Sequence, residues 1–366
     1  MSSRIRPRHS LLALATVATV ALTACGGSSG DDAGGSASSG SSAKGGEPVK
    51  AKIMLEYPAN ASHVYMISGQ ERGTFKAAGI DPEVVFPDDP STPVKALGAG
   101  RVDFALQLST GPVIAKAQGT DVKIIGTLEN LPLGILTLAG KANSFRDLKG
   151  GTVGITDSTW NKECLKRTLA GNGMTEKDIK IVDPGTSLAA PLISGKLQGV
   201  IGSQYEQAII KTQTGRDTKV FEYTDYCPKS GIQIMTTGKM IKEHPDTVRK
   251  MLKGISDSLA WSMANPDEAA AIYGKKFPEQ NAKSNLAQWK ASVPTFCEAY
   301  SSTKGLLWAD PTQYQRLIDL VVDAGVLDKS YPVNTVVDDS FLPSPPVTKP
   351  CAGDLYKRDP LAELDR

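Results

Sequence analysis

The feature that most constrains this chain is an alternation of short apolar runs with helix-forming segments, which begins near Val49. The first runs have the length and apolar character of buried strands, and each follows a helical or turn segment. They lie at residues 53–55, 84–86, 102–106, 122–128 and 133–138. A parallel sheet that is covered by helices on both faces produces this order. The alternation therefore predicts an α/β fold.

The alternation restarts after Gly150 with strand-like runs at 152–155, 179–182 and 199–201. A further strand is predicted at 231–237, after which the pattern becomes almost wholly helical. Apolar residues then recur three and four positions apart between Val248 and Met263, which is typical of one face of a long helix. Two α/β units followed by a helical tail predict two lobes with a cleft between them. Ligands bind in such clefts at the carboxyl ends of the strands.

The N-terminus has the charge pattern of a secretory signal. Three arginines precede Leu11–Ala24, a segment without charge that is too short to span a membrane as a helix. It ends in Leu22-Thr23-Ala24-Cys25, which resembles the lipobox of bacterial lipoproteins, where cleavage precedes a diacylated cysteine. We therefore expect residues 1–24 to be a lipoprotein signal peptide and Cys25 to be lipidated. The alternative is a plain secreted protein in which Cys25 has no special role.

Residues 25–48 have the composition of a flexible tether. Gly26–Gly46 contains eight Gly and seven Ser in 21 residues, and a coil of this kind has a reach of about 25–30 Å. Two acyl signals hold a protein stably at a membrane. Signal cleavage leaves 38 basic and 39 acidic side chains, a balance that favours neither a polybasic anchor nor a nucleic-acid-binding surface. The predicted location is the extracytoplasmic face of the cell membrane, held by a lipid anchor.

Four cysteines remain after cleavage: Cys164, Cys227, Cys297 and Cys351. An even number in an exported protein predicts two disulfides, for which three connectivities are possible. None of the spacings is typical of a C-x-x-C motif or a metal site, and only two histidines remain, His63 and His244. The sequence therefore argues against a zinc site or a Cys/His catalytic pair. We expect neither a metal nor another cofactor.

A series of segments resembles one family. Leu55–His63, continued by Glu71–Phe75 and Ala78–Ile80, is similar to the opening of the solute-binding proteins of ABC importers in the thiamine-pyrimidine-precursor, taurine, sulfonate and nitrate group. Further blocks match in the same order, and the resemblance runs from about residue 49 to 266. They lie at 94–97, 100–104, 147–154 and 195–200. Tyr57 stands where the group often has Trp, Pro58-Ala59 replaces an aromatic-Pro pair, and Gln198 replaces an acidic residue.

The resemblance implies a two-lobe periplasmic-binding-protein type II fold and delivery of a small polar solute to an ABC permease by a monomer. Residues 49–140 and 231–366 would form lobe 1 with the helical tail, and residues 141–230 would form lobe 2. Within this division we expect the disulfides Cys164–Cys227 in lobe 2 and Cys297–Cys351 on the tail. Each of these crosslinks would stay inside one structural unit and leave the hinge free.

Ligand contacts are expected from turns after strands and from helix N-termini. The candidates are Tyr57, Asn60, His63, Gln107, Ser109, Thr110, Asp157, Ser158, Thr159, Trp160, Tyr205 and Glu206. Several of them have a structural alternative. The hydroxyl groups are good helix caps, Trp160 is an ordinary core residue, Glu206 suits a solvated helix face, and His63 suits a core or capping position.

The aromatic ring of Tyr57, a neutral His63 and the Tyr205-Glu206 pair favour a flat, nitrogen-containing heterocycle, such as a thiamine pyrimidine precursor. The segments that we place at the cleft contain no Arg or Lys, whereas an anion site gathers cations. A taurine, sulfonate or nitrate binder of the same fold is the alternative. Two alternatives belong to other functional classes. One is a pyrimidine-synthase-like enzyme, although the cysteine-rich iron motif of those enzymes does not occur here. The other is a surface lipoprotein that binds another protein. We expect a binding protein and not an enzyme.

Overall fold

The computed structural model describes residues 46–185 and 187–352. The chain divides into two units, residues 1–44 and 45–366, and everything below concerns the described part of the second unit. The predicted signal peptide, Cys25 and nearly all of the predicted tether lie outside the described residues. None of the helices that are described combines the length and the apolar composition needed to cross a membrane.

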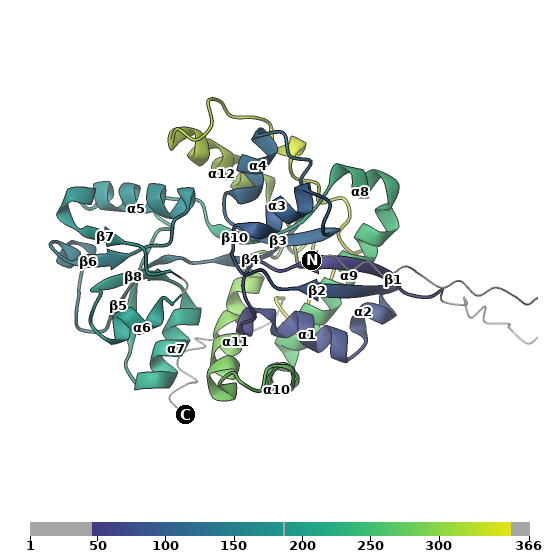
Figure 1. Ribbon diagram of the computed structural model, residues 1–366, viewed down its shortest axis with the longest axis horizontal. Helices are drawn as coiled ribbons and strands as arrows, with labels where there is room; N and C mark the ends of the chain where they lie inside the picture. Colours follow the sequence, from purple (N-terminus) through teal and green to yellow (C-terminus); the bar gives the residue numbers. More distant parts are fainter. Residues whose placement is uncertain (1–45, 186, 353–366) are drawn as a thin grey trace, which may run out of the picture. The chain divides into compact units, whose positions relative to one another are not determined.

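The first lobe is built on a five-stranded sheet with the order β2-β1-β3-β10-β4 (Figure 1). Its strands are β1 (Val49–Met54), β2 (Ile80–Val85), β3 (Phe104–Leu108), β4 (Lys123–Leu131) and β10 (Ser230–Thr236). The strand β1 runs parallel to β2 and β3, whereas β10 is antiparallel to both β3 and β4. The returning strand β10 therefore lies inside the sheet and separates β3 from β4.

The second lobe repeats this arrangement in the order β7-β6-β8-β5-β9. Its strands are β5 (Gly134–Leu138), β6 (Thr152–Gly154), β7 (Lys180–Val182), β8 (Gly199–Gly202) and β9 (Thr218–Glu222). The predicted two-lobe α/β fold is confirmed. One boundary is corrected, because β5 pairs with β8 and β9 although the sequence placed it in lobe 1. The chain crosses between the sheets at residues 132–133, since β4 and β5 are separated by only two residues.

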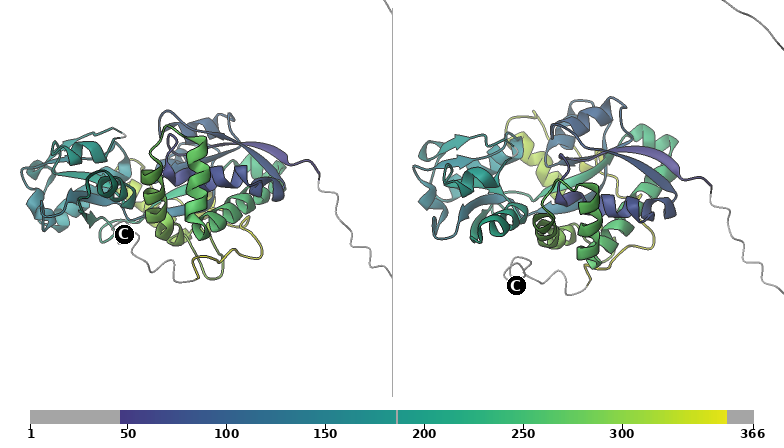
Figure 2. Two further views of the ribbon diagram at one scale, coloured as in Figure 1. Left: turned by 90° about the horizontal axis from the view of Figure 1, so that it is seen from below. Right: turned by 60° about the horizontal axis from the view of Figure 1, so that its bottom comes forward.

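Helices cover both sheets (Figures 1 and 2). Lobe 1 carries α1 (Val64–Glu71), α2 (Thr74–Ala77), α3 (Thr92–Gly98), α4 (Gly111–Ala117), α8 (Gly238–Glu243), α9 (Pro245–Ala264), α10 (Pro266–Lys276), α11 (Ala282–Cys297) and α12 (Pro311–Asp323), and lobe 2 carries α5 (Thr159–Gly171), α6 (Ala189–Ile193) and α7 (Gln204–Thr214). The predicted apolar face of α9 is fully buried and packs on α1. Two contacts join the lobes through helices: α7 packs against α11, and α12 packs against α4 and α5.

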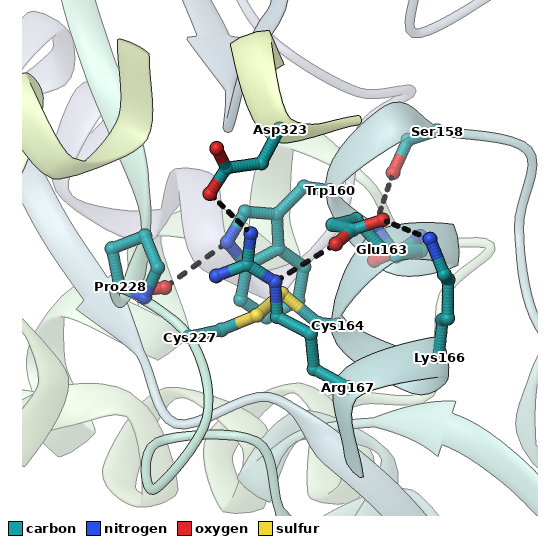
Figure 3. The surroundings of a disulfide bond; sticks show 10 residues. Ser158, Trp160, Glu163, Cys164, Lys166, Arg167, Cys227, Pro228 and Asp323 are labelled. Atoms are coloured by element: carbon teal, nitrogen blue, oxygen red, sulfur yellow. Dashed lines mark hydrogen bonds and ion pairs between the residues drawn. A yellow bond between two sulfur atoms is a disulfide. The ribbon is translucent and has the colours of Figure 1, made fainter. Parts of the chain in front are cut away.

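The structure contains the two disulfides in the expected pairing. Cys297 at the end of α11 is bonded to Cys351, so the tail is fixed to lobe 1. Cys164 of α5 is bonded to Cys227, which lies in the crossover between β9 and β10 (Figure 3). The Cys164–Cys227 bond therefore connects lobe 2 to the crossover segment itself. We had expected both disulfides to leave the hinge free.

Candidate ligand-binding site

An open cleft of about 780 Å³ lies between the lobes and is formed by turns that follow strands. From lobe 1 the residues after β3 contribute, and from lobe 2 the residues after β6 and at the start of α5. Seven of the predicted ligand residues line it: Tyr57, Gln107, Ser109, Thr110, Asp157, Ser158 and Thr159. The structure therefore brings these seven together, from three segments that are far apart in the sequence.

Ser109 is the most unusual residue of the cleft. Its backbone φ is 63°, in the left-handed region that side chains other than Gly rarely adopt, and its buried Oγ has no hydrogen-bond partner among the described residues. Backbone strain of this kind clusters at binding and active sites. Next to it, the Gln107 amide donates to the carbonyl O of Pro90 at 2.9 Å, which fixes the loop before α3. The turn after β3 is thus held rigidly while one hydroxyl group stays unpaired.

The opposite wall is the N-terminal end of α5. Ser158 caps this helix, because its Oγ accepts from the backbone N–H of Asn161 at 3.1 Å. The lining also includes two lysines, contrary to the expectation that no cation would lie at the cleft. Lys162 lies 2.5 Å from Asp157 and Lys166 lies 3.5 Å from Glu163, so both ammonium groups are paired with carboxylates.

A second polar region, the buried carboxyl cluster, joins residues of both lobes and is not part of the cleft lining. We define it as Glu56, His63, Tyr65, Glu129, Tyr205 and Thr295. The backbone N–H of Asn60 donates to His63 Nδ1 at 3.3 Å, so Nε2 carries the ring proton and donates to Glu56 Oε1 at 2.9 Å. A neutral imidazole satisfies both contacts.

The two carboxyl groups of the cluster differ in their surroundings. Burial disfavours the ionised form of Glu56, but the His63 ring and the Ser62 hydroxyl outweigh it and hold the pKa below its usual value. For Glu129, burial raises the pKa to about 8, and the hydrogen bonds from Thr295 and Tyr205 offset this only in part. Glu56 Oε2 and the Tyr65 hydroxyl group are both buried and have no partner among the described residues.

The structure places the other five predicted residues outside the cleft lining. Asn60 caps the 3-10 helix η1 (Ala61–His63), and the Glu206 carboxylate accepts from the backbone N–H of Ser203 at 2.8 Å, so it caps α7. Trp160 is a buried core residue whose Nε1 donates to the carbonyl O of Pro228 at 3.0 Å (Figure 3). His63 and Tyr205 belong to the buried carboxyl cluster. Trp160 and His63 match their structural alternatives, whereas Glu206 is a partly buried cap and not the solvated helix residue of its alternative.

Sequence reasoning missed Glu56 and Glu129. Glu129 had a signal that was available, because it is a charged residue inside the apolar run of β4, and a carboxyl group is rarely buried unless it has a partner or a role. Glu56 was named only as part of the block that opens the family resemblance. Among the described residues, no group of three or more His, Cys, Asp or Glu side chains is arranged to hold a metal ion.

Comparison with known proteins places the chain in a family. The formylaminopyrimidine-binding protein of Halalkalibacterium halodurans is 26% identical over 227 residues, which cover 60% of this chain and 68% of that protein. The 4-amino-5-hydroxymethyl-2-methylpyrimidine phosphate synthase THI5 of Saccharomyces cerevisiae is 26% identical over 269 residues, covering 69% and 77%. The fold is similar to that of the periplasmic aliphatic sulphonate binding protein SsuA from Escherichia coli, with a TM-score of 0.60, 16% identity and coverage of 79% and 92%. Residues 60–269, more than half of the chain, match the NMT1/THI5-like family, and the chain belongs to that family.

Proposed function

We propose that this protein is the extracytoplasmic solute-binding component of an ABC importer and that it binds a flat aminopyrimidine between its lobes. In this proposal it is a monomeric binding protein and not an enzyme, and it passes the solute to permease subunits in the membrane. The family resemblance of the sequence and the fold shared with a sulphonate-binding protein support the transport role. The name of the relative from Halalkalibacterium halodurans supports the ligand class.

The observation that carries the ligand class is the unpaired oxygen of Glu56. A buried carboxylate oxygen without a partner costs free energy until a donor reaches it. The exocyclic amino group of an aminopyrimidine is a donor of this kind, and the unpaired hydroxyl of Tyr65 can donate to one of its ring nitrogens, which are acceptors. A nitrate ion and a sulfonate group have no N–H donor and are repelled by a carboxylate, and taurine has its only N–H donors on a flexible ammonium group rather than on a flat ring. The two lysines of the cleft do not offset this, since each is already paired.

A thermal-shift experiment tests the ligand class. A hydroxymethyl- or formylaminopyrimidine is expected to raise the melting temperature, because a ligand at 100 times its dissociation constant adds about 2.7 kcal/mol of stability. Taurine and nitrate are expected to have no effect. Glu56→Gln should reduce the pyrimidine shift, whereas the exposed control Glu222→Gln should leave it unchanged. A shift with taurine or nitrate and none with a heterocycle would overturn the ligand class while leaving the transport role intact.

The proposed membrane anchor is the acylated Cys25, connected to the folded part by the Gly/Ser-rich segment. Cys25→Ala is expected to move the protein from the membrane fraction to the soluble fraction and to prevent normal processing of the signal. Fractionation of cells followed by mass spectrometry of the N-terminus measures both effects. Normal processing and unchanged membrane retention of the variant would contradict the anchor.

A further inference from the structure

We propose that Glu129 is a positioning residue that holds the two lobes together only when its carboxyl group is protonated, so that solute binding takes up a proton from water. The inference rests on the proposed solute-binding function. It concerns closure of the lobes and not contact with the solute, and it assigns a role to a buried acid that the ligand contacts do not use.

Glu129 lies at the junction of the lobes. It is on β4 of lobe 1 and is fully buried, two residues from the end of the strand and close to the crossing at residues 132–133. The hydroxyl group of Tyr205, on α7 of lobe 2, donates to its carboxyl oxygens at 3.2 and 3.3 Å. Around this bond α7 packs closely against α11, where Ala208 meets Ala287 and Ala291. Figure 2 shows the two helices side by side. The bond therefore forms only when the lobes meet along these helices.

The hydrogen-bond geometry indicates where a proton lies. The Thr295 Oγ1 atom is 2.6 Å from Glu129 Oε2 and also 2.6 Å from the carbonyl O of Ser292. A hydroxyl group has one hydrogen, and a carbonyl oxygen only accepts. If the Thr295 hydroxyl donates to Ser292, the contact with Glu129 is a hydrogen bond only when Glu129 Oε2 carries a proton and donates it. A protonated Glu129 therefore satisfies both short contacts at once.

The charges around Glu129 favour the same form. The groups that face it are Glu56 after β1, Tyr65 of α1 and Tyr205 of α7, with the His63 ring of η1 bonded to Glu56. From α11 it meets the neutral side chain of Thr295, and its register partner on β10 is Ile232. No Lys or Arg of the described residues is among the groups that shift its pKa. A carboxylate here would face a second carboxylate without a compensating cation.

The sign of the pH dependence follows from burial. When α7 withdraws from α11, Glu129 meets water and its pKa returns toward the ordinary value for a carboxyl group. In the closed form the pKa is raised to about 8. Protonation therefore stabilises closure, fully at pH values below the pKa of the open form, and this contribution is lost as pH rises through about 8. At pH values between the pKa of Glu129 in the open form and its pKa in the closed form, the solute affinity should fall by up to about tenfold for each unit that the pH rises. Close to one proton is taken up per bound solute in this range.

Isothermal titration calorimetry with a hydroxymethyl-aminopyrimidine tests the inference in two buffers of different ionisation enthalpy. Near neutral pH the wild type should take up close to one proton per bound solute, and its dissociation constant should rise about tenfold per pH unit. Glu129→Gln preserves the shape and the hydrogen bonds of the protonated acid, so it should bind tightly without proton uptake and without pH dependence. The control Glu222→Gln should behave as the wild type does. A wild type without proton uptake would overturn the inference.

Small-angle X-ray scattering of the ligand-free protein separates this inference from the proposed ligand class. The ligand-free wild type should be open at neutral pH, and its radius of gyration should fall as pH is lowered toward the ordinary pKa of a carboxyl group, because protonation favours closure. The radius of gyration of Glu129→Gln should stay at the smaller value at every pH. If no pyrimidine binds at any pH, the ligand class is wrong, but the scattering result still decides the inference. A radius of gyration that does not change with pH in the wild type overturns it.

Discussion

The open cleft and the buried carboxyl cluster both join polar side chains of the two lobes, but they differ in how their charged groups are stabilised. The cleft takes its side chains mainly from turns after strands, whereas most of the cluster comes from helices and from strand β4. In the cleft, Asp157 and Glu163 are paired with lysines, and Asp157 and both lysines reach water. In the cluster, Glu56 and Glu129 are buried and rely on neutral hydrogen-bond donors. Solvent screens the charges in the cleft, so each ion pair there contributes little to stability. In the cluster, a carboxyl group that loses a hydrogen bond has no water to replace it, so the loss is costly.

The largest effect is expected for His63→Ala. The substitution removes the donor to Glu56 Oε1 and leaves a buried carboxylate poorly satisfied. Leaving a buried acceptor without its donor costs about 1–3 kcal/mol, and more when the acceptor is charged, so the free energy of unfolding should fall by about 3 kcal/mol. Urea denaturation followed by circular dichroism measures it. A loss below about 1 kcal/mol would show that the cluster is as tolerant as the cleft.

The wall of the cleft should depend on its covalent link more than on its charges. Replacing Cys164 and Cys227 together by Ala should lower the free energy of unfolding by about 2–4 kcal/mol. It should also weaken solute binding, because α5 carries the Ser158 end of the cleft. The matched double variant of Cys297 and Cys351 should lose similar stability with little change in affinity. Equal losses of affinity in both double variants would contradict a local role for the first disulfide.

A smaller effect is expected at Ser109. Glycine adopts the φ of 63° without the backbone strain of about 1–2 kcal/mol that other residues have there. Its unfolded chain has more conformational freedom, however, and this lowers the free energy of unfolding by about 0.5–1 kcal/mol. Ser109→Gly should therefore stabilise the protein by about 0.5–1 kcal/mol and yet weaken solute binding, because the unpaired hydroxyl group is removed. Thermal melts with and without the pyrimidine measure both quantities. Unchanged solute affinity would show that this hydroxyl does not contact the ligand.

The smallest effect is expected for Asp157→Asn in the cleft. Its partner Lys162 and Asp157 itself are both exposed, and pairs of this kind contribute about 0–1 kcal/mol. The free energy of unfolding should change by less than about 0.5 kcal/mol in the same urea experiment used for His63→Ala. A change as large as that of His63→Ala would remove the contrast between the two regions.

The sequence predicted the strands whose residues are apolar throughout, and it did less well where tertiary context decides. The edge strand β9 was missed because Thr218–Glu222 mixes charged and apolar residues on a half-exposed edge. The run that became β5 was recognised as a strand, but no local pattern shows which sheet it joins. Among the site residues, hydroxyl groups after strands were located correctly. Glu206 and Trp160 were misplaced because a cap and a core residue have the same local sequence as a ligand contact.

The position of β10 has a consequence for the order in which the chain folds. Because β10 pairs with both β3 and β4, the first sheet lacks the strand that joins β3 to β4 until residues 230–236 have been added. The second lobe is continuous in sequence from β5 to β9 and completes its sheet without waiting for later residues. Before β10 is in place, β3 and β4 have unpaired edges that can pair with the wrong strand. The long sequence separation between β10 and β3 also slows formation of the sheet. The lobe that begins first along the chain is therefore the lobe that finishes last.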